Sequence, residues 1–273
     1  DDGGVSWQAA GLEKTRHIGA ILVDPRDART VLVAALGHVF GPNAERGVYR
    51  STDGGSNWER TLYVSDATGA VDLAADPTNP DVVYAAGWQG RYRPWLSYFT
   101  PNIGPESGIY RPTDGGRHWA RLAGGGWPVG PLARIGLAAT HTHAGTRVYA
   151  LIDAEENGGL YRSDDAGASW QRANDDSELI NGYFARLSVM PDDPDTVIAM
   201  GRSIHRCTAG GTKCEIIKGS PGGDDYHDIW INPRRPDHMI TGSDQGSVVT
   251  VDGGAHWSSW YNQPTGQFYH LAA

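Results

Sequence analysis

Long apolar runs are missing from this 273-residue chain. No stretch approaches the roughly 18 residues that span a bilayer, so no membrane span is expected. A basic surface is missing as well, because the formal net charge is −9. Binding to phosphate backbones needs clustered positive charge, so no nucleic-acid partner is expected. Apolar residues also lack the 3.6-residue period of amphipathic helices, which excludes a helical protein.

Several chemical signatures are missing too. The sequence contains no phosphate-cradling loop, nucleophile elbow or zinc motif. His141 and His143 alternate in THTH, a spacing that two metal ligands can use, but no third ligand lies near them. A surface turn is the better interpretation. We therefore expect neither a cofactor nor a metal ion.

What the chain does have is a recurring glycine-rich motif. Its copies read DGGVSW at 2–7, STDGGSNW at 51–58, PTDGGRHW at 112–119, SDDAGASW at 163–170 and TVDGGAHW at 250–257. The glycines supply positive φ for a tight hairpin, and the Asp side chain can hold the backbone amides of the turn. The Trp is expected to pack between neighbouring units. The predicted structural residues are Asp2, Trp7, Asp53, Trp58, Asp114, Trp119, Asp165, Trp170, Asp252 and Trp257.

A degenerate copy of the motif, CTAGGTKC, occupies residues 207–214 and holds both cysteines of the chain. Cys207 and Cys214 replace the first and last residues of the motif. Because a tight hairpin brings these positions opposite each other, we predict a cross-hairpin disulfide there. The alternative is two buried free thiols. A disulfide would favour an extracellular or periplasmic location.

A proline-containing motif alternates with the first. Its copies read VDPRDARTVLVA at 23–34, ADPTNPDVVYAA at 75–86, MPDDPDTVIAM at 190–200 and NPRRPDHMI at 232–240, with a divergent ATHTHAGTRVYAL at 139–151. Proline fixes φ and removes a donor where the chain reverses. Short β-branched and aromatic runs flank every copy, so each period of about 50 residues predicts four strands.

This pattern predicts an all-β fold, a single β-propeller domain over residues 1–273 with four-stranded antiparallel blades. The five full blades are expected at 15–62, 69–123, 133–174, 183–218 and 227–261. Residues 1–10 and 267–273 are interpreted as strands of incomplete blades. A piece of a larger propeller is favoured over a ring closed by pairing those two end strands.

The glycine-rich motif resembles the Asp-box, or bacterial neuraminidase, repeat S/T-x-D-x-G-x-x-W. That repeat occurs in sialidases, tandem-propeller xyloglucanases, sortilin-type receptors and a photosystem assembly factor. The resemblance covers essentially the entire chain and implies a propeller, but it says little about function. GHVFGPNAERGVYRSTDGG at 37–55 and NQPTGQFYH at 262–270 resemble segments of large bacterial glycosyl-hydrolase-like proteins of this class.

Propeller topology sorts the loops into two rims. Glycine-rich hairpins and proline corners join strands three to four and one to two, so both belong on one rim. The opposite rim carries the longer, irregular loops, where binding residues usually lie. We expect a ligand across the face formed by residues 38–46, 88–107, 153–158 and 219–228.

Aromatic and basic residues gather on those loops and at the channel mouth. Aromatic faces stack on sugars, and arginine forks bind hydroxyls or carboxylates. The alternative is that the rings only pack the loop onto its blade. The predicted substrate-binding residues are Trp88, Arg91, Arg93, Trp95, Arg134 and His227.

Two acids are predicted as catalytic, Asp228 in GDDYHDIW and Asp244 in GSDQG. Glycoside hydrolysis uses two carboxylates that flank the bond. Asp244 resembles the catalytic Asp in the TDVGGAYR-like motif of tandem-propeller xyloglucanases, although only the Asp and the first Gly agree clearly. Asp153 matches the same place with an insertion. Each acid alone fits a turn-stabilising role equally well, and in those xyloglucanases the two acids come from two propellers.

Sialidase chemistry is less well supported. It would need an arginine triad and a Tyr–Glu pair; Arg16 and Arg134 are candidate arginines, but ARIG at 133–136 only faintly matches the expected FRIP-like start. We therefore predict a carbohydrate-active, glycoside-hydrolase-like propeller that binds a polysaccharide or oligosaccharide. The alternative is a non-catalytic, sortilin-like or scaffold module that binds a protein. In both cases we expect this propeller to act together with the remainder of a longer chain or with a partner propeller.

Overall fold

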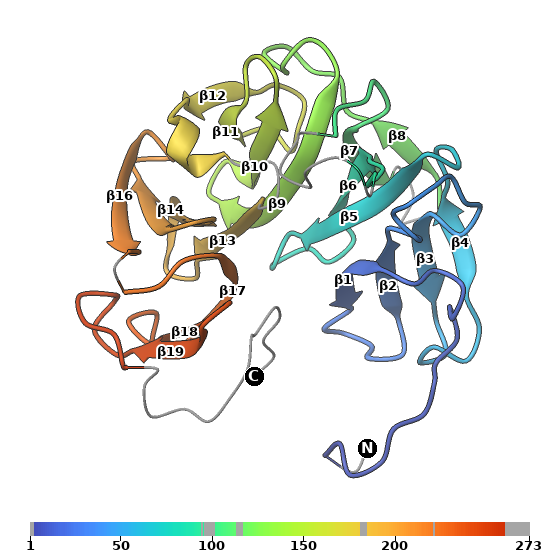
Figure 1. Cartoon of the computed structure of the whole chain (residues 1–273), viewed down its shortest axis with the longest axis horizontal. Coiled ribbons are helices and arrows are strands. Elements are labelled where there is room, and N and C mark those ends of the chain that lie inside the picture. The colour runs from blue at the N-terminus through green and yellow to red at the C-terminus, as the bar shows by residue number, and fades with distance from the viewer. Residues whose placement is uncertain are drawn as a thin grey trace.

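The computed structural model describes residues 3–93, 95, 102–112, 117–180, 185–220 and 222–259. Within these residues the chain forms five antiparallel sheets arranged around a common centre (Figure 1). This confirms the predicted all-β, five-bladed propeller. The one helix in the described residues is the 3-10 turn Ser177–Leu179. No helix among them has the length and apolar character needed to cross a bilayer.

Each blade runs outward from an inner strand. Blade 1 contains β1 (Ile18–Val23), β2 (Val31–Ala35), β3 (Gly47–Ser51) and β4 (Glu59–Leu62), and blade 2 contains β5 (Thr68–Ala75), β6 (Val83–Gln89), β7 (Gly108–Pro112) and β8 (Trp119–Arg121). Blade 3 contains β9 (Leu132–Thr142), β10 (Gly145–Ala154), β11 (Gly159–Ser163) and β12 (Gln171–Asn174). Blade 4 contains β13 (Arg186–Met190), β14 (Asp193–Met200), β15 (Ile204–Thr208) and β16 (Lys213–Lys218). Blade 5 contains β17 (Tyr226–Ile231), β18 (Met239–Ser243) and β19 (Gly246–Thr250).

Blade 5 and the chain ends differ from the expected pattern. No fourth strand is assigned to blade 5 in the described residues up to 259, although the Ser258 amide donates to Val249 at 2.8 Å. Residues 3–10, expected as an outer strand, form turns and irregular backbone. Trp7 is 88% exposed and donates to Gly4 of its own turn, so it packs against no blade. The expected strand at 267–273 lies outside the described residues.

The glycine-rich hairpins and the proline corners lie on one rim. In blade 1 the Gly54 amide donates to the Arg29 carbonyl at 2.9 Å, and in blade 4 the Gly210 amide donates to Asp195 at 2.8 Å. Blades 3 and 5 repeat this bond between hairpin and corner. Because adjacent antiparallel turns alternate between rims, the remaining loops lie on the opposite rim. We call that rim the recognition face; its described residues are 36–46, 88–93, 95, 102–107, 153–158, 219–220 and 222–226.

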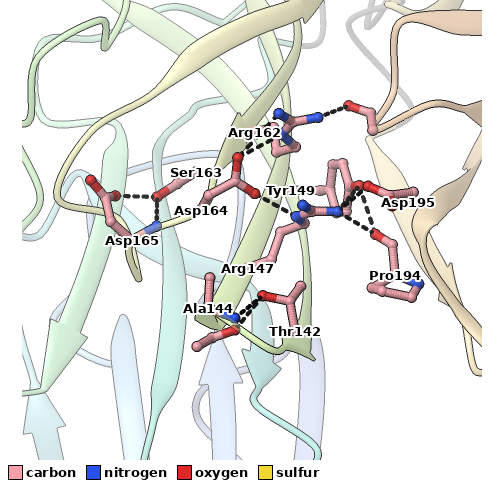
Figure 2. Close-up of polar contacts among 12 residues, drawn as sticks. Thr142, Ala144, Arg147, Tyr149, Arg162, Ser163, Asp164, Asp165, Pro194 and Asp195 are labelled. Carbon is pink, nitrogen blue, oxygen red and sulfur yellow. Dashed lines mark hydrogen bonds and ion pairs between the residues drawn. The ribbon is translucent and has the colours of Figure 1, made fainter.

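The hairpin aspartates hold their turns as the sequence suggested. Asp165 accepts a bond from the Ser163 hydroxyl at 2.8 Å, as Figure 2 shows, and a second from the Ser169 amide at 2.8 Å. Asp53 and Asp252 repeat these contacts. Hydrogen bonds, chiefly from Asn57 and His256, lower the pKa of Asp53 and Asp252 to about 2. Asp2 and Asp114 lie outside the described residues.

The hairpin tryptophans join each blade to the one before it. Trp119 Nε1 donates to Thr61 Oγ1 of β4 at 3.3 Å, and Trp257 Nε1 donates to the Ile217 carbonyl of β16 at 3.0 Å. Trp58 bonds Ala10 in the same way. Trp170 is buried and packs edge-on against Trp127 with ring centroids 5.0 Å apart. These contacts run between sheets that share few backbone bonds.

Charged side chains also join the blades on the hairpin rim. Between blades 3 and 4, Arg147 contacts Asp164 and Asp195 at 2.5 Å and donates to the Pro194 carbonyl at 3.1 Å (Figure 2). Tyr149 adds a bond from its hydroxyl to the same carbonyl at 2.8 Å. One arginine therefore fastens a proline corner of blade 4 to a hairpin of blade 3.

The degenerate hairpin of blade 4 is closed by a disulfide. Cys207 and Cys214 are paired across β15 and β16 with Cα atoms 4.0 Å apart. This confirms the predicted disulfide. Ala209 stands where the other hairpins have Asp, so the covalent bond replaces the lost side-chain contacts.

His141 and His143 lie at the β9–β10 turn, on the hairpin rim. His141 Nδ1 is 3.3 Å from Asp76 Oδ2, and Thr146 donates to the same oxygen at 2.6 Å. The histidine thus contacts the proline corner of blade 2. The described residues contain no group of three His, Cys, Asp or Glu side chains arranged to hold a metal ion.

An ion pair between a buried aspartate and a half-buried arginine crosses the centre of the propeller. Arg186 on β13 donates to Asp72 on β5 at 3.1 Å and to the Gly19 carbonyl on β1 at 2.9 Å. Asp72 also accepts from the Leu137 amide on β9 at 2.9 Å. These hydrogen bonds therefore connect four inner strands, β1, β5, β9 and β13. Burial raises the pKa of Asp72, while Arg186 and the backbone amides act against that rise.

Candidate functional site

The strand registers place two aspartates at equivalent positions on the recognition face. Asp153 lies two residues after Leu151, which pairs with Gly136 of the inner strand β9. Asp244 lies two residues after Gly242, which pairs with Asp228 of the inner strand β17. Both acids therefore stand where a second strand ends at the recognition face, in blades 3 and 5.

Asp244 is held by His227. His227 Nε2 lies 2.9 Å from Asp244 Oδ1, and the histidine is buried at the start of β17. Burial lowers the pKa of His227, so the ring is neutral near pH 7. An ionised carboxylate only accepts hydrogen bonds, so Nε2 carries the proton in this contact. The imidazole fixes the direction of the carboxylate, as orienting partners do in catalytic sites.

A β-bulge brings this pair together. The register of β17 against β18 is irregular between Tyr226 and Asp228, which leaves His227 as the extra residue. A bulge re-aims a side chain that regular alternation would direct elsewhere. Blades 1 and 2 have the same irregularity at Gly19 and Val71. The bulge therefore belongs to the repeat, and only blade 5 has a histidine there.

Other charges surround the pair. Asp225 lies two residues from His227, and burial raises its pKa, with the negative charges of Asp224 and Asp244 acting in the same direction. The charge of Arg134 on β9 helps to lower the pKa of His227. Charged groups from blades 3 and 5 thus meet at the mouth of the central channel.

Asp153 is a buried carboxyl with an unsatisfied oxygen. Asp153 is 5% exposed, and its Oδ2 has no hydrogen-bond partner among the described residues. Desolvation raises its pKa to about 6, opposed only by a bond from the Ala154 amide. Natural folds rarely leave a buried polar atom unpaired without a functional reason. A carboxyl that stays protonated near pH 6 can donate a proton at that pH.

We expect an Asp153→Asn variant to be more stable than the natural chain at pH 8. A folded-state pKa raised by about two units makes ionisation unfavourable in the fold and costs about 3 kcal/mol above pH 6. This loss of folding stability disappears as pH falls from 6 towards 4, because the carboxyl of Asp153 then becomes protonated in both the folded and the unfolded chain. Urea unfolding at pH 8, 6 and 4 should show a gain that shrinks with pH.

The matched control for that experiment is Asp165→Asn. Hydrogen bonds from Ser169 lower the pKa of Asp165, so its ionised form stabilises the fold and the variant should lose stability at pH 8. Equal responses of the two variants would show that Asp153 is not desolvated as the structure has it.

The predicted catalytic residue Asp228 has a different setting. Its Oδ1 accepts from the Ile229 amide at 2.9 Å, just as Asp72 accepts from Leu73 at 3.0 Å. The register places Asp228 and Asp72 at equivalent positions on the channel wall. The carboxylate that contacts His227 is Asp244. The pairing of Asp228 with Asp244 stays a prediction.

The predicted substrate-binding residues divide into buried and exposed groups. Trp88 is 2% exposed and donates from Nε1 to the Asn102 carbonyl at 2.9 Å, so its ring is not the exposed platform that the sequence suggested. Arg134 lies over that ring at 5.9 Å. Trp95 is 73% exposed, and Arg91 and Arg93 are exposed. The expected stacking surface is therefore reduced to Trp95 among the described aromatic residues of this loop.

Comparison with known proteins shows similarity to xyloglucanases. A xyloglucanase from Paenibacillus sp is 26% identical over 228 residues, which cover 71% of this chain and 20% of that protein. A xyloglucanase from Hypocrea jecorina is 23% identical over 235 residues, which cover 83% of this chain and 23% of that protein. The chain thus spans about a fifth of the length of these relatives. No protein-family model matches the chain.

Solved structures show the same fold. The GH74 xyloglucanase from Xanthomonas campestris superposes with a TM-score of 0.59 at 21% identity, over 90% of this chain and 38% of that one. At this identity the likeness concerns the arrangement of the blades. Sequence relatives and a structural neighbour are therefore xyloglucanases.

Proposed function

We propose that this propeller acts on carbohydrate, with a glycan lying across the recognition face and the bond to be cleaved at the channel mouth. The observation that carries the proposal is the pair of acids at equivalent strand ends. Asp153 has a raised pKa, and Asp244 is oriented by a neutral histidine. Two carboxyl groups in such different surroundings suit the acid and base roles of glycoside hydrolysis.

In this proposal Asp153 donates a proton to the leaving oxygen and Asp244 acts as the ionised carboxylate. Asp228 is the alternative partner of Asp244. The similarity to xyloglucanases supports a polysaccharide as substrate. Because the chain covers about a fifth of those relatives, we also propose that a further part of the polypeptide or a partner propeller completes the groove.

We further propose an extracellular or periplasmic location. Polysaccharides are encountered outside the cytoplasm, and disulfides persist in oxidising compartments. The Cys207–Cys214 bond supports this location.

A glycan-binding screen followed by a reducing-end assay tests the proposed function. We expect binding of at least one oligosaccharide and release of new reducing ends, fastest below pH 6 where Asp153 keeps its proton. Binding without release would favour the non-catalytic module. A chain that binds no glycan at all would contradict the proposal.

A further inference from the structure

A second feature of the recognition face is a cavity between blades 1 and 2. Its volume is about 330 Å³, and it lies between the loop at 41–46 and the loop at 89–105. The side chains that matter on its wall are Arg46, Arg91, Arg93, Gln89 and Asn102. Among the described residues that line it there are three arginines and no Asp or Glu. This is a concentration of positive charge on a protein whose net charge is −9.

Arg46 is a buried cation without a bonded carboxylate in the described part of the chain. The residue is 1% exposed, and its guanidinium donates to the carbonyls of Ala67 at 2.7 Å and Gly90 at 3.1 Å. The guanidinium also donates to the carbonyls of His38 and Gly41. Within the part of the chain that the structure describes, Arg46 Nε has no hydrogen-bond partner, and burial lowers the pKa of the guanidinium. Carbonyl dipoles hold the guanidinium in place but do not cancel its charge.

Asp66 and Glu106, which flank the wall residues Ala67 and Pro105, are hydrogen-bonded to other groups. Asp66, whose charge acts on Arg46, accepts from the Tyr63 hydroxyl. Glu106 accepts from the hydroxyls of Ser65 and Thr68. Neither acid lines the cavity. The described wall therefore carries three arginines and no carboxylate, and the charge of Asp66 offsets part of that of Arg46 from outside the cavity.

Arg91 and Arg93 supply donors that a ligand can reach. Both are exposed, and Arg91 Nε donates to the Phe40 carbonyl at 3.0 Å, which fixes the direction of its guanidinium. A guanidinium fork matches the two oxygens of a carboxylate or a sulfate. An anchored fork loses less conformational freedom on binding than a lysine would.

We propose that this cavity binds the negatively charged group of an acidic sugar, either a uronic acid carboxylate or a sulfate ester. The inference rests on the proposed function and names its substrate class. A glycan is favoured over an acidic peptide because the cavity and the acid site lie on the same rim of the propeller, the recognition face. Side-chain contacts connect the two places: Trp88 donates to the Asn102 carbonyl, Arg134 lies over the Trp88 ring, and the charge of Arg134 lowers the pKa of His227. An extended glycan chain on this rim would meet both.

Isothermal titration with matched oligosaccharides tests the inference. Tetragalacturonate and a sulfated tetrasaccharide are compared with cellotetraose, which is neutral and of equal length. We expect an acidic tetrasaccharide to bind at least tenfold more tightly, and the two acidic probes identify which oxyanion the cavity prefers. In an Arg91→Gln/Arg93→Gln variant this preference should fall to less than twofold, because the acidic tetrasaccharide loses much more affinity than cellotetraose does.

The control is Arg29→Gln/Arg235→Gln, which removes the same charge from exposed arginines on the hairpin rim and should keep the preference. Equal affinity for acidic and neutral sugars in the natural chain would overturn this inference and leave the proposed function standing. If no oligosaccharide binds, both fall. Tighter binding of a tetraglutamate peptide than of any sugar would overturn the glycan assignment.

Discussion

An Asp72→Ala variant should lose about 3–5 kcal/mol of folding free energy, the largest stability effect we expect from one substitution. The change leaves the half-buried Arg186 at the centre of the propeller without its counter-charge, and it removes the acceptor of the Leu137 amide. An uncompensated buried charge costs more than the ion pair gains. Urea unfolding followed by tryptophan fluorescence measures the loss.

The double variant Asp72→Leu/Arg186→Met is the control for that experiment. It replaces both charges by apolar groups, so much of the lost stability should return. A double variant as unstable as Asp72→Ala would mean that packing or the Leu137 bond, rather than the stranded charge, accounts for the loss. An Asp72→Ala variant of unchanged stability would show that the pair does not tie the inner strands.

An Asp244→Asn variant should lower kcat for glycan hydrolysis by about 10²- to 10⁴-fold, the range that a positioned acid or base contributes. The amide keeps a hydrogen bond to His227 but cannot act as a base or nucleophile. Binding of the oligosaccharide should change little, because Asn has the size of Asp. Measuring kcat and the dissociation constant separately distinguishes the loss of a reacting group from the loss of a contact.

Two further variants sharpen that result. Asp228→Asn should be nearly as active as the natural chain if Asp153 is the acid, and nearly inactive if Asp228 is the partner of Asp244. The pH profile gives an independent readout, because a general acid must be protonated. Activity should fall as pH rises through about 6. In an Asp153→Asn variant the remaining activity should no longer fall over this pH range. Full activity of Asp244→Asn would remove Asp244 from the mechanism.

Much of the fold follows from local signals in the sequence. The glycine-rich hairpin needs only Ser163, Asp165 and the glycine after them to set its bonds, and the hairpins of blades 1 and 5 repeat them. The pairing of Cys207 with Cys214 follows from their positions in the same hairpin. Because these contacts lie within eight residues, spacing alone predicts them. The blade-to-blade bonds of Trp119 and Trp257 follow from the repeat.

The candidate site was only partly predictable, because its contacts depend on long-range geometry. The sequence pointed to Asp228, His227 and Asp244, but it does not show the bulge in β17 that brings His227 to Asp244. Trp88 looks like an exposed ring in the sequence, yet the loop folds back so that Asn102 accepts its Nε1 hydrogen. The sequence gives no local sign of the Arg46 contacts, which join two blades.

The most direct test of the account is a crystal structure of the chain with a bound oligosaccharide that the screen has identified. We expect density along the recognition face, from the cavity at Arg91 past Arg134 to the His227–Asp244 pair. A sugar seated instead on the hairpin rim, in the cavity of about 360 Å³ beside Asp24 and Asp76, would contradict the account.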